Sequence, residues 1–577
     1  MLARLRDWYR STFGHAAVGA VLLWAALPPL GVYVLPWGAL EGLGLPPLGP
    51  CLLAWLAPVW WVLLVRTAEL PGRRPYRALW LAGFLFWLAA LQWMRLPHWL
   101  TGFGWVALSV YLGFYLPVFV GLSRVAVHRL RLPVIVACPM VWTGLELARG
   151  HLLSGITMAS LGHTQYRWIE LIQIGDLAGA YGAGFVVMFV ATCLARTAPC
   201  AGNPRSFRPL VPAVAVLGAA VAYGHLRVSR EQGEPEARIG LIQGSIDVVL
   251  EPEPGTRERM HAQYRELSEW AVARYGDLDL IIWPETVFGY SLFDYDPDLR
   301  VPDAWSGSEA EFRWRLQQEA AKSRQPMQDL ARHLDTPLLV GVTTWFLGAD
   351  AEKQFNSAAF APLSEEPIGR YDKMHLVMFG EYIPFDKELS WLVRLTPLST
   401  LKIGVDPGRE PAVFELVLNP EPRTLNPRVL RIAPNICYES VIPHLIRRQV
   451  NTLAQKGQEP DVLANLTNDG WFWGSSELDM HLVCGVFRAV ECRKPFLIAA
   501  NTGFSAWIDA DGRIVAQGPR RATGVLVAEV APDPRKSWYL AHGDWPAGVC
   551  QAACLLLAAV GLWDRFGRRR RSRTSRS

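Results

Sequence analysis

Long apolar segments limit what this chain can fold into more than any other feature of its sequence. Seven lie in the first 230 residues, at about 14–35, 48–66, 77–95, 103–123, 132–149, 174–195 and 209–226, and an eighth runs from about 546 to 563. A helix needs about 20 apolar residues to cross the hydrocarbon core of a bilayer. Pro28, Pro29 and Pro58 would kink the first two helices without abolishing them. The sequence therefore predicts a multi-pass α-helical membrane domain with about eight transmembrane helices.

The charged residues are spread unevenly along the chain. They make up 19% of it, against about 25% in an average soluble protein, while 51% of the residues are hydrophobic. Residues from about 235 to 540 have the composition of an ordinary globular domain. We therefore expect a membrane domain of about seven helices at 1–230, a soluble domain at 235–540, a C-terminal membrane helix at 545–565 and a basic tail at 566–577.

Arginines mark one side of the predicted membrane domain. They gather near the N-terminus, in the second, fourth and sixth loops and in the tail "RFGRRRRSRTSRS"; those before the tail are Arg4, Arg6, Arg10, Arg73, Arg74, Arg77, Arg124, Arg129, Arg131, Arg196, Arg205 and Arg208. Cytoplasmic loops are enriched in Lys and Arg, so both termini are expected in the cytoplasm and the soluble domain on the opposite face.

Both ends of the chain allow a second interpretation. A cleaved signal peptide is disfavoured, because six further apolar segments follow the first and no clear small-x-small cleavage site is present. The basic tail could bind nucleic acid, but beside a membrane helix it indicates an anchor on anionic lipid. We expect no nucleic-acid partner.

The soluble domain alternates short apolar runs with helical stretches. Expected strands lie at 237–244, 278–286, 337–344, 356–362, 429–440, 462–469 and 496–509, and expected helices at 257–275, 311–334 and 477–493. Strands this apolar need cover on both faces, which favours a layered α/β sandwich. No C-x-x-C, G-x-G-x-x-G, P-loop or H-E-x-x-H motif occurs, so we predict neither a metal site nor a cofactor.

Three short segments place polar residues where apolar strands end. They are "IIWPET" with Glu285, "RYDKMHLVMFGEYIPF" with Lys373 and Glu381, and "APNICYES" with Cys437 and Glu439. Taken singly, such a carboxylate or lysine is usually a solvated surface charge, and such a cysteine is usually part of a core. The three segments together indicate a reactive site.

A cysteine in this setting could act as a nucleophile. It attacks as the thiolate, so it needs a base. The nearest histidine in sequence, His444, follows a proline-ended turn. A partly desolvated carboxylate can accept the proton instead, and Glu285 is the candidate. Lys373 and the backbone N–H of Tyr438 would stabilise the oxyanion that forms when the thiolate adds to a carbonyl, which leads to a thioester.

These motifs resemble the Glu–Lys–Cys signature of the nitrilase superfamily, and the whole chain resembles its membrane-bound branch, the bacterial apolipoprotein N-acyltransferases. The likeness covers seven apolar segments before the soluble domain and one after it. It includes "WTGLELARG", "NDGWF" at 468–472, "NTGFSAWI" at 501–508 and "DWP" ahead of the last segment. The resemblance implies an α-β-β-α sandwich outside the cytoplasm, on the periplasmic side of a bacterial inner membrane.

The resemblance also implies a reaction. An acyl chain would pass from a membrane phospholipid to the cysteine, and then to the α-amino group of a diacylglyceryl-modified cysteine at the N-terminus of an apolipoprotein. Glu285 would be the base, Lys373 the oxyanion stabiliser and Cys437 the nucleophile. The supporting residues would be an auxiliary carboxylate, two residues beside the nucleophile and a pocket asparagine, namely Glu381, Tyr438, Glu439 and Asn356.

The chain departs from the family pattern in three places. The loop "DVVLEPEPGTRE" at 247–258 lacks the tryptophan expected over the substrate. Gly470 replaces an alanine, which should loosen one turn, and the segment 289–325 is long and acidic, with a solvated loop and a helix start expected there.

Two other functions remain open from the sequence. A membrane-anchored amidase could use the same three residues, although seven helices are excessive for an anchor. A transporter or receptor with a ligand-binding domain would be expected to carry charges within its spans, and almost none are found.

Glu146 and Arg149, three residues apart, are expected to form an internal pair, and His481 to be a packed or surface residue rather than a ligand.

Overall fold

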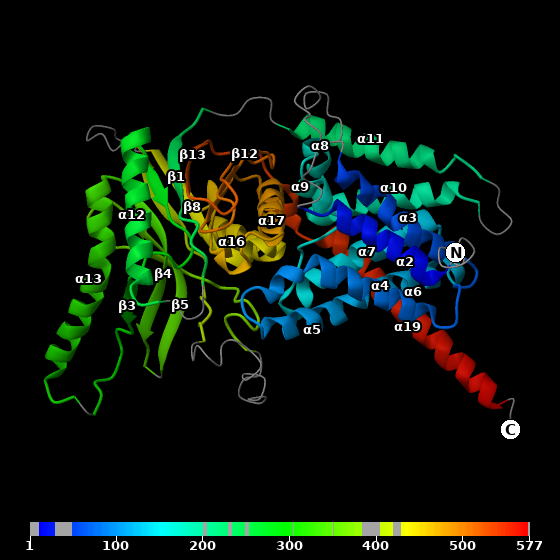
Figure 1. Ribbon diagram of the computed structural model, residues 1–577, viewed down its shortest axis with the longest axis horizontal. Coiled ribbons are helices and arrows are strands. Elements are labelled where there is room, and N and C mark those ends of the chain that lie inside the picture. The colour runs from blue at the N-terminus through cyan, green and yellow to red at the C-terminus, as the bar shows by residue number, and fades with distance from the viewer. Residues whose placement is uncertain are drawn as a thin grey trace. The chain divides into compact units, whose positions relative to one another are not determined.

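The computed structural model describes residues 11–28, 49–199, 205–228, 234–248, 253–303, 305–349, 351–383, 404–418 and 428–574, with side chains described as far as 563. Arg4, Arg6, Arg10, Pro29 and the side chains of the basic tail lie outside this part. The chain forms two compact units. A helical unit comprises Met1–Arg95, Gly102–Ser229 and Ser537–Ser577, and a sandwich unit comprises Leu96–Thr101 and Arg230–Lys536 (Figure 1).

The helical unit has at least one helix on each of the eight apolar segments, and two on the segment at 103–123. The helices are α2 (Thr12–Ala26), α3 (Leu53–Arg66), α4 (Pro75–Ala90), α5 (Thr101–Gly113), α6 (Tyr115–His128), α7 (Val134–His151), α10 (Ala180–Thr197), α11 (Leu210–Arg227) and α19 (Trp545–Thr574). Among the described residues, four stretches are long and apolar enough to cross a membrane: Thr101–His128, Ala180–Thr197, Leu210–Arg227 and Trp545–Trp563. The number of eight transmembrane helices is therefore not confirmed.

Local breaks explain why several of these helices are shorter than their apolar segments. The segment at 77–95 leaves the α-helix at Ala90 and continues as a 3₁₀ turn, Gln92–Arg95. The segment at 174–195 is interrupted at Gly179, whose φ of 66° separates the short helix α9 (Gly175–Ala178) from α10. Such a positive φ is open to glycine without strain and cannot continue a helix.

Small residues let two helices of this unit come close. A Cβ atom added to Gly144 of α7 would lie 2.6 Å from the carbonyl oxygen of Cys550 and 2.8 Å from Sγ of Cys554, both on α19. Close backbone approach at a small residue is a common way for apolar helices to pack when water supplies no driving force.

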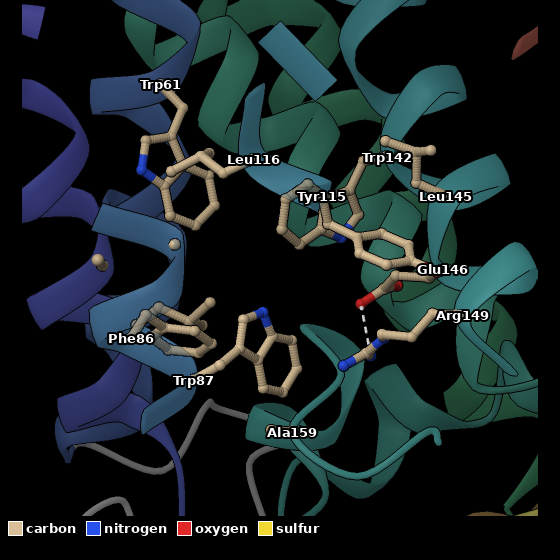
Figure 2. Close-up of a pocket in the computed structure, with 13 residues that line it drawn as sticks. Trp61, Phe86, Trp87, Tyr115, Leu116, Trp142, Leu145, Glu146, Arg149 and Ala159 are labelled. Atoms are coloured by element: carbon tan, nitrogen blue, oxygen red, sulfur yellow. Dashed lines mark ion pairs between the residues drawn. The ribbon is translucent and has the colours of Figure 1, made fainter. Parts of the chain in front are cut away.

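A buried ion pair fixes the loop after α7. Glu146 and Arg149 lie 3.8 Å apart, which confirms the expected internal pair. Glu146 Oε1 accepts from the backbone N–H of Leu161 at 2.9 Å, and Arg149 donates to the carbonyl of Met158 at 3.1 Å and to Ser160 Oγ at 2.7 Å. Figure 2 shows the pair at the edge of a tryptophan-lined cavity. The ion pair therefore holds the segment 158–161, which leads from α7 toward α10.

The sandwich unit is built on two sheets of described strands. The first has the order β13-β1-β2-β4-β5-β6, with β3 paired to β4; its strands are β1 (Ala237–Gln243), β2 (Leu280–Ile282), β3 (Ser291–Tyr295), β4 (Leu338–Leu347), β5 (Glu352–Ala361), β6 (Gly369–Asp372) and β13 (Gly524–Val530). The second has the order β12-β11-β10-β9-β8-β7, and its strands are β7 (Phe414–Leu418), β8 (Arg428–Ile436), β9 (Val462–Thr467), β10 (Phe496–Ala500), β11 (Ala506–Ile508) and β12 (Ile514–Gln517).

Alternate side chains of these strands enter different cores. Leu280 and Ile282 join the core between the sheets, whereas Ile281 joins a core beneath helices. Because side chains alternate across a strand, a strand covered on both faces has to be apolar throughout.

Helices cover the outer faces of both sheets. α12 (Thr256–Tyr275) and α13 (Glu309–Leu334) pack on the first sheet, and α16 (Pro443–Gln455) and α17 (Glu477–Cys492) lie on the side of the second (Figure 1). At Gly485 of α17 the nearest atoms belong to side chains of β10 and β11. The predicted α-β-β-α sandwich is confirmed.

Two expectations about elements are wrong. The single strand expected at 496–509 is an antiparallel pair, β10 and β11, joined by a turn. The segment 289–325 is more than a solvated loop and a helix start. It contains β3, which runs parallel to β4, and a small core of Leu299, Phe312 and Leu316.

Candidate active site

The predicted reactive side chains lie at or near strand ends of both sheets. Glu285 follows β2, Lys373 follows β6, and Cys437 follows β8 as the first residue of a 3₁₀ turn, Cys437–Val441. Asn356 lies within β5 and pairs with Thr343 of β4. Strand ends leave side chains uncovered by the sheet, so residues distant in sequence can converge there.

Lys373 lies between two carboxylates. Its Nζ is 2.8 Å from Glu381 Oε1 and 3.2 Å from Glu285 Oε1, and the lysine side chain is only 1% exposed. The side-chain amide of Asn356 donates to the same two oxygens, at 2.7 Å to Glu285 and 3.2 Å to Glu381. The structure therefore brings four of the predicted site residues into one hydrogen-bonded group.

The charge of Lys373 is maintained by its neighbours. Burial alone would lower the pKa of the ammonium group, but the negative charges of Glu285 and Glu381 outweigh burial and raise this pKa well above its usual value. Lys373 is therefore a permanent, buried cation.

The second carboxylate oxygen of Glu285 is held from the other sheet. The backbone N–H of Asn468, directly after β9, donates to Glu285 Oε2 at 3.0 Å. The side chain of Asn468 lies 3.4 Å from the carbonyl of Glu285 and also accepts from Asn501 at 2.9 Å. The orientation of Glu285 thus depends on both sheets.

Glu439 ties the nucleophile turn to the lysine loop. Its carboxylate accepts from the backbone N–H groups of Ile436 at 2.7 Å, Met374 at 2.8 Å and His375 at 3.0 Å, and from the hydroxyl of Tyr371. Burial raises the pKa of Glu439, and these N–H donors oppose the rise. Because one carboxylate spans both segments, Lys373 and Cys437 cannot move apart without breaking its bonds.

Cys437 has an unusual backbone and a protonated thiol. Its φ is 50°, a left-handed conformation that non-glycine residues rarely adopt and that is common at functional sites. Burial and the charge of Glu285 raise the pKa of the thiol well above its usual value, against the opposing effect of Lys373. At rest the group is therefore a thiol, and it needs a base to become a nucleophile.

Tyr438 lies next to the lysine loop. Its ring stacks on that of His375, with centroids 6.2 Å apart and planes 15° apart. The aromatic ring therefore packs against the segment that follows Lys373.

Gly470 fills a tight position, contrary to the loosening expected there. A Cβ atom at this position would lie 2.9 Å from the carbonyl oxygen of Ile246 and 2.9 Å from Cγ2 of Val248. The missing side chain therefore lets the segment after β1 approach the turn that follows β9.

Several side chains of this region are given no role by the sequence motifs, although Asn468 and Asp469 lie in "NDGWF". Asn468 orients Glu285, and Asn465 Nδ2 lies 3.1 Å from the carbonyl oxygen of Cys437. Asp469, Glu477 and His481 form a buried group whose ligand atoms lie within 4.8 Å of one another, near enough to hold a metal ion. The apolar run "VLANLTND" ends in polar residues, so the reasoning used for the other strand ends would have drawn attention to residues 465–469.

The sequence matches two known domains in succession. Residues 19–193 match the N-terminal domain of apolipoprotein N-acyltransferase, and residues 238–539 match the carbon-nitrogen hydrolase domain. The apolipoprotein N-acyltransferase of Geobacter metallireducens is 32% identical over 91% of this chain and 93% of its own length. That of Rhodopirellula baltica is 29% identical over 96% of this chain and 97% of its own length. The likeness therefore extends through both units.

Proposed function

Because the chain belongs to the apolipoprotein N-acyltransferase family, whose members are membrane enzymes that N-acylate lipoproteins, we propose that Glu285, Lys373 and Cys437 carry out this reaction through a thioester. The observation that supports it best is the buried ammonium group of Lys373, which lies within 3.2 Å of Glu285 Oε1 and whose charge also acts on the Cys437 thiol.

In the first half-reaction the cysteine takes an acyl chain from a phospholipid. Glu285 accepts the proton of the Cys437 thiol while sulfur attacks the ester carbonyl carbon. The oxyanion is stabilised by the Lys373 ammonium and the backbone N–H of Tyr438. Collapse of the intermediate breaks the ester C–O bond, the glycerol oxygen takes the proton from Glu285, and a lysophospholipid leaves.

In the second half-reaction the chain passes to the lipoprotein. The α-amino group of the diacylglyceryl-cysteine attacks the thioester carbonyl and gives a proton to Glu285. Collapse of this second intermediate breaks the C–S bond, and the sulfur regains the proton. The products are an N-acylated lipoprotein and the resting thiol, so no cofactor is consumed.

Glu381 and Asn356 are proposed to hold the charges in place. Glu381 accepts from the backbone N–H of Val377 at 2.8 Å and from Lys373, so it anchors the lysine. Asn356 bridges both carboxylates. Glu285 is then free to change its protonation state while Lys373 keeps a second counter-charge.

The proposed location is a bacterial inner membrane, with the sandwich unit on the periplasmic face and both termini in the cytoplasm. The arginine-rich loops of the helical unit support this orientation. A lipid donor also accounts for a hydrolase-like site attached to so many apolar helices.

Intact-mass spectrometry of the full chain in phospholipid nanodiscs tests the proposal. Wild type should carry an acyl-sized adduct that neutral hydroxylamine removes. Cys437→Ala should carry none, and Cys550→Ala, which removes another half-buried cysteine, should behave as wild type. An adduct on Cys437→Ala, or none on folded wild type, would overturn the thioester route.

A second step tests the acceptor. Adding a diacylglyceryl peptide with a free α-amino group should discharge the adduct and add one acyl chain to the peptide. The same peptide with a blocked amine should leave the adduct intact. Discharge by water alone, without acylated peptide, would favour the amidase alternative.

A further inference from the structure

We infer that His481 is a positioning residue for the nucleophile, because it holds the strained backbone turn of Cys437 from behind, with Asp469 as its counter-charge. This inference rests on the proposed role of Cys437. His481 lies on α17, far along the chain from the turn, and no predicted catalytic step uses it.

The contacts of His481 reach the nucleophile turn directly. Its Nε2 lies 3.2 Å from the carbonyl oxygen of Cys437 and 2.8 Å from Oγ of Ser440, three residues further along the same turn. Its Nδ1 lies 3.2 Å from Asp469 Oδ1. The imidazole is 4% exposed, so water cannot replace these bonds at little cost.

The partners determine which nitrogens carry protons. A carboxylate oxygen only accepts, so Nδ1 donates to Asp469. The Ser440 hydroxyl gives its own proton to the Cys437 carbonyl at 3.2 Å, so its oxygen and that carbonyl both accept from Nε2. A ring that donates from both nitrogens is an imidazolium. Burial would lower the pKa of His481, but the charges of Asp469 and Glu477 raise it to about 9, in agreement with the geometry.

The turn needs such support because Cys437 adopts a positive φ. A left-handed residue with a side chain persists only where its surroundings over-determine it. The carbonyl of Cys437 has three donors: Ser440 of its own turn at 3.2 Å, Asn465 of β9 at 3.1 Å and His481 of α17 at 3.2 Å. Asn465 belongs to the second sheet and His481 to a helix that covers it, so these two donors fix the cysteine relative to that sheet.

The alternative to this assignment is a metal site formed by Asp469, Glu477 and His481. A metal at Nδ1 would require that nitrogen to have no proton, and it would pull Asp469 away from the direct bond. The two assignments differ in one measurable quantity, the metal content of the purified protein.

Single-turnover acylation of the full chain tests the inference. In His481→Leu, which removes both donors, we expect the rate of thioester formation at saturating phospholipid to fall about 100-fold, the effect of a nucleophile displaced by about 1 Å. The phospholipid concentration for half-maximal rate should change less than about twofold. His481→Gln, whose amide N–H can still reach the turn, should recover at least about tenfold.

Two controls separate positioning from general stability. Val483→Ala, a cavity on the same helix at a residue 1% exposed, should lower the melting temperature without slowing acylation of the folded protein. His333→Gln, at an exposed histidine of α13, should change neither quantity. If His481→Leu does not fold, His481→Gln and Val483→Ala still give the comparison.

Three results would overturn the inference. The first is thioester formation at the wild-type rate in His481→Leu. The second is an equal slowing in Val483→Ala and His481→Leu at matched melting temperature. The third is one equivalent of metal in wild type that His481→Gln loses. Absence of a thioester in wild type would instead refute the proposed function.

Discussion

At the scale of single residues, the decisive feature is a buried cation held by one buried and one partly buried carboxylate. A charge removed from water is costly unless a partner and hydrogen bonds compensate it. Lys373, Glu285 and Glu381 compensate one another. Asn356 donates to the same two carboxylate oxygens as Lys373, and Asn468 donates to the second oxygen of Glu285. Removing the cation should therefore affect the fold as well as the chemistry.

We predict that Lys373→Met destabilises the protein by about 3–5 kcal/mol, because it leaves the buried Glu285 and the partly buried Glu381 side by side without a counter-charge. Thioester formation should be lost as well. The control is Lys456→Met, which breaks an ion pair with Glu410 between two exposed side chains and should leave the melting temperature nearly unchanged. Thermal unfolding in nanodiscs measures both variants, and equal melting temperatures would contradict the prediction.

The stability of the sandwich unit should depend on the protonation of His481. Its pKa is about 9 in the folded protein and about 6.5 when unfolded, so its stabilising effect is complete below pH 6.5 and is lost as the pH rises through 9. This shift in pKa corresponds to about 3 kcal/mol of the free energy of unfolding. The groups facing it are Asp469 and Glu477.

A pH series of melting curves checks this dependence. The melting temperature of wild type should fall between pH 7 and pH 10 by more than that of His481→Gln. Parallel pH profiles for the two proteins would show that the histidine is neutral in the fold.

At the scale of elements, the crossing of α7 and α19 depends on one glycine. At Gly144 a Cβ atom would lie 2.6 Å from a backbone oxygen, which cannot turn aside as a side chain could. At Gly548, on α19 itself, no heavy atom lies within 4 Å. The two glycines therefore form a matched pair.

We predict effects of opposite sign for the two alanine substitutions. Gly144→Ala should destabilise the helical unit by about 1–3 kcal/mol through overpacking. Gly548→Ala should be neutral or stabilise its helix by up to about 1 kcal/mol, since alanine has the higher helix propensity. Melting temperatures of the two variants in the same detergent give the comparison, and a loss in both would point to a general effect of substitution.

The sequence predicts long, doubly buried elements well and short ones poorly. β1, β4 and β9 are buried over most of their length and β8 is buried from Ile432 onward, and each is expected from its apolar pattern. β3, β7 and β12 are four or five residues long, and at least two residues of each are exposed or partly exposed, so their pattern is weak. β3 pairs with β4 on the other side of α13, while β7 and β12 pair with the strands next to them in sequence, so strands this short depend on their partners rather than on their own pattern.

The same limit applies to the site. Glu285, Lys373 and Cys437 occur in recognisable motifs, and the structure brings Glu285 and Lys373 together as expected. Asn465 and His481 act on the backbone of Cys437. A bond to a carbonyl oxygen can be made from many positions, so it leaves little trace in the sequence.

At the scale of the whole molecule, the lengths of the apolar helices and the distribution of arginines bear on different aspects of membrane topology. Helix length and composition identify four stretches able to span a membrane among the described residues. The arginine pattern predicts the sides of the loops without counting spans. Loop accessibility is therefore the sharper test of topology.

We predict that a membrane-impermeant thiol reagent added to intact cells labels Trp99→Cys but not Arg129→Cys, in a background with Cys437→Ala. Both positions are exposed, and they lie in the third and fourth predicted loops. In inverted membrane vesicles the labelling should be reversed. Labelling of both from the same side would contradict the proposed orientation.

The protonated resting state of Cys437 also bears on the compartment in which the enzyme is proposed to work. Oxidants and disulfide-forming catalysts react with thiolates far faster than with thiols. Burial and the charge of Glu285 raise the pKa of this thiol, which keeps the sulfur protonated until the proton is taken from it. The arrangement that makes the nucleophile dependent on a base thus also shields it from oxidative inactivation between turnovers.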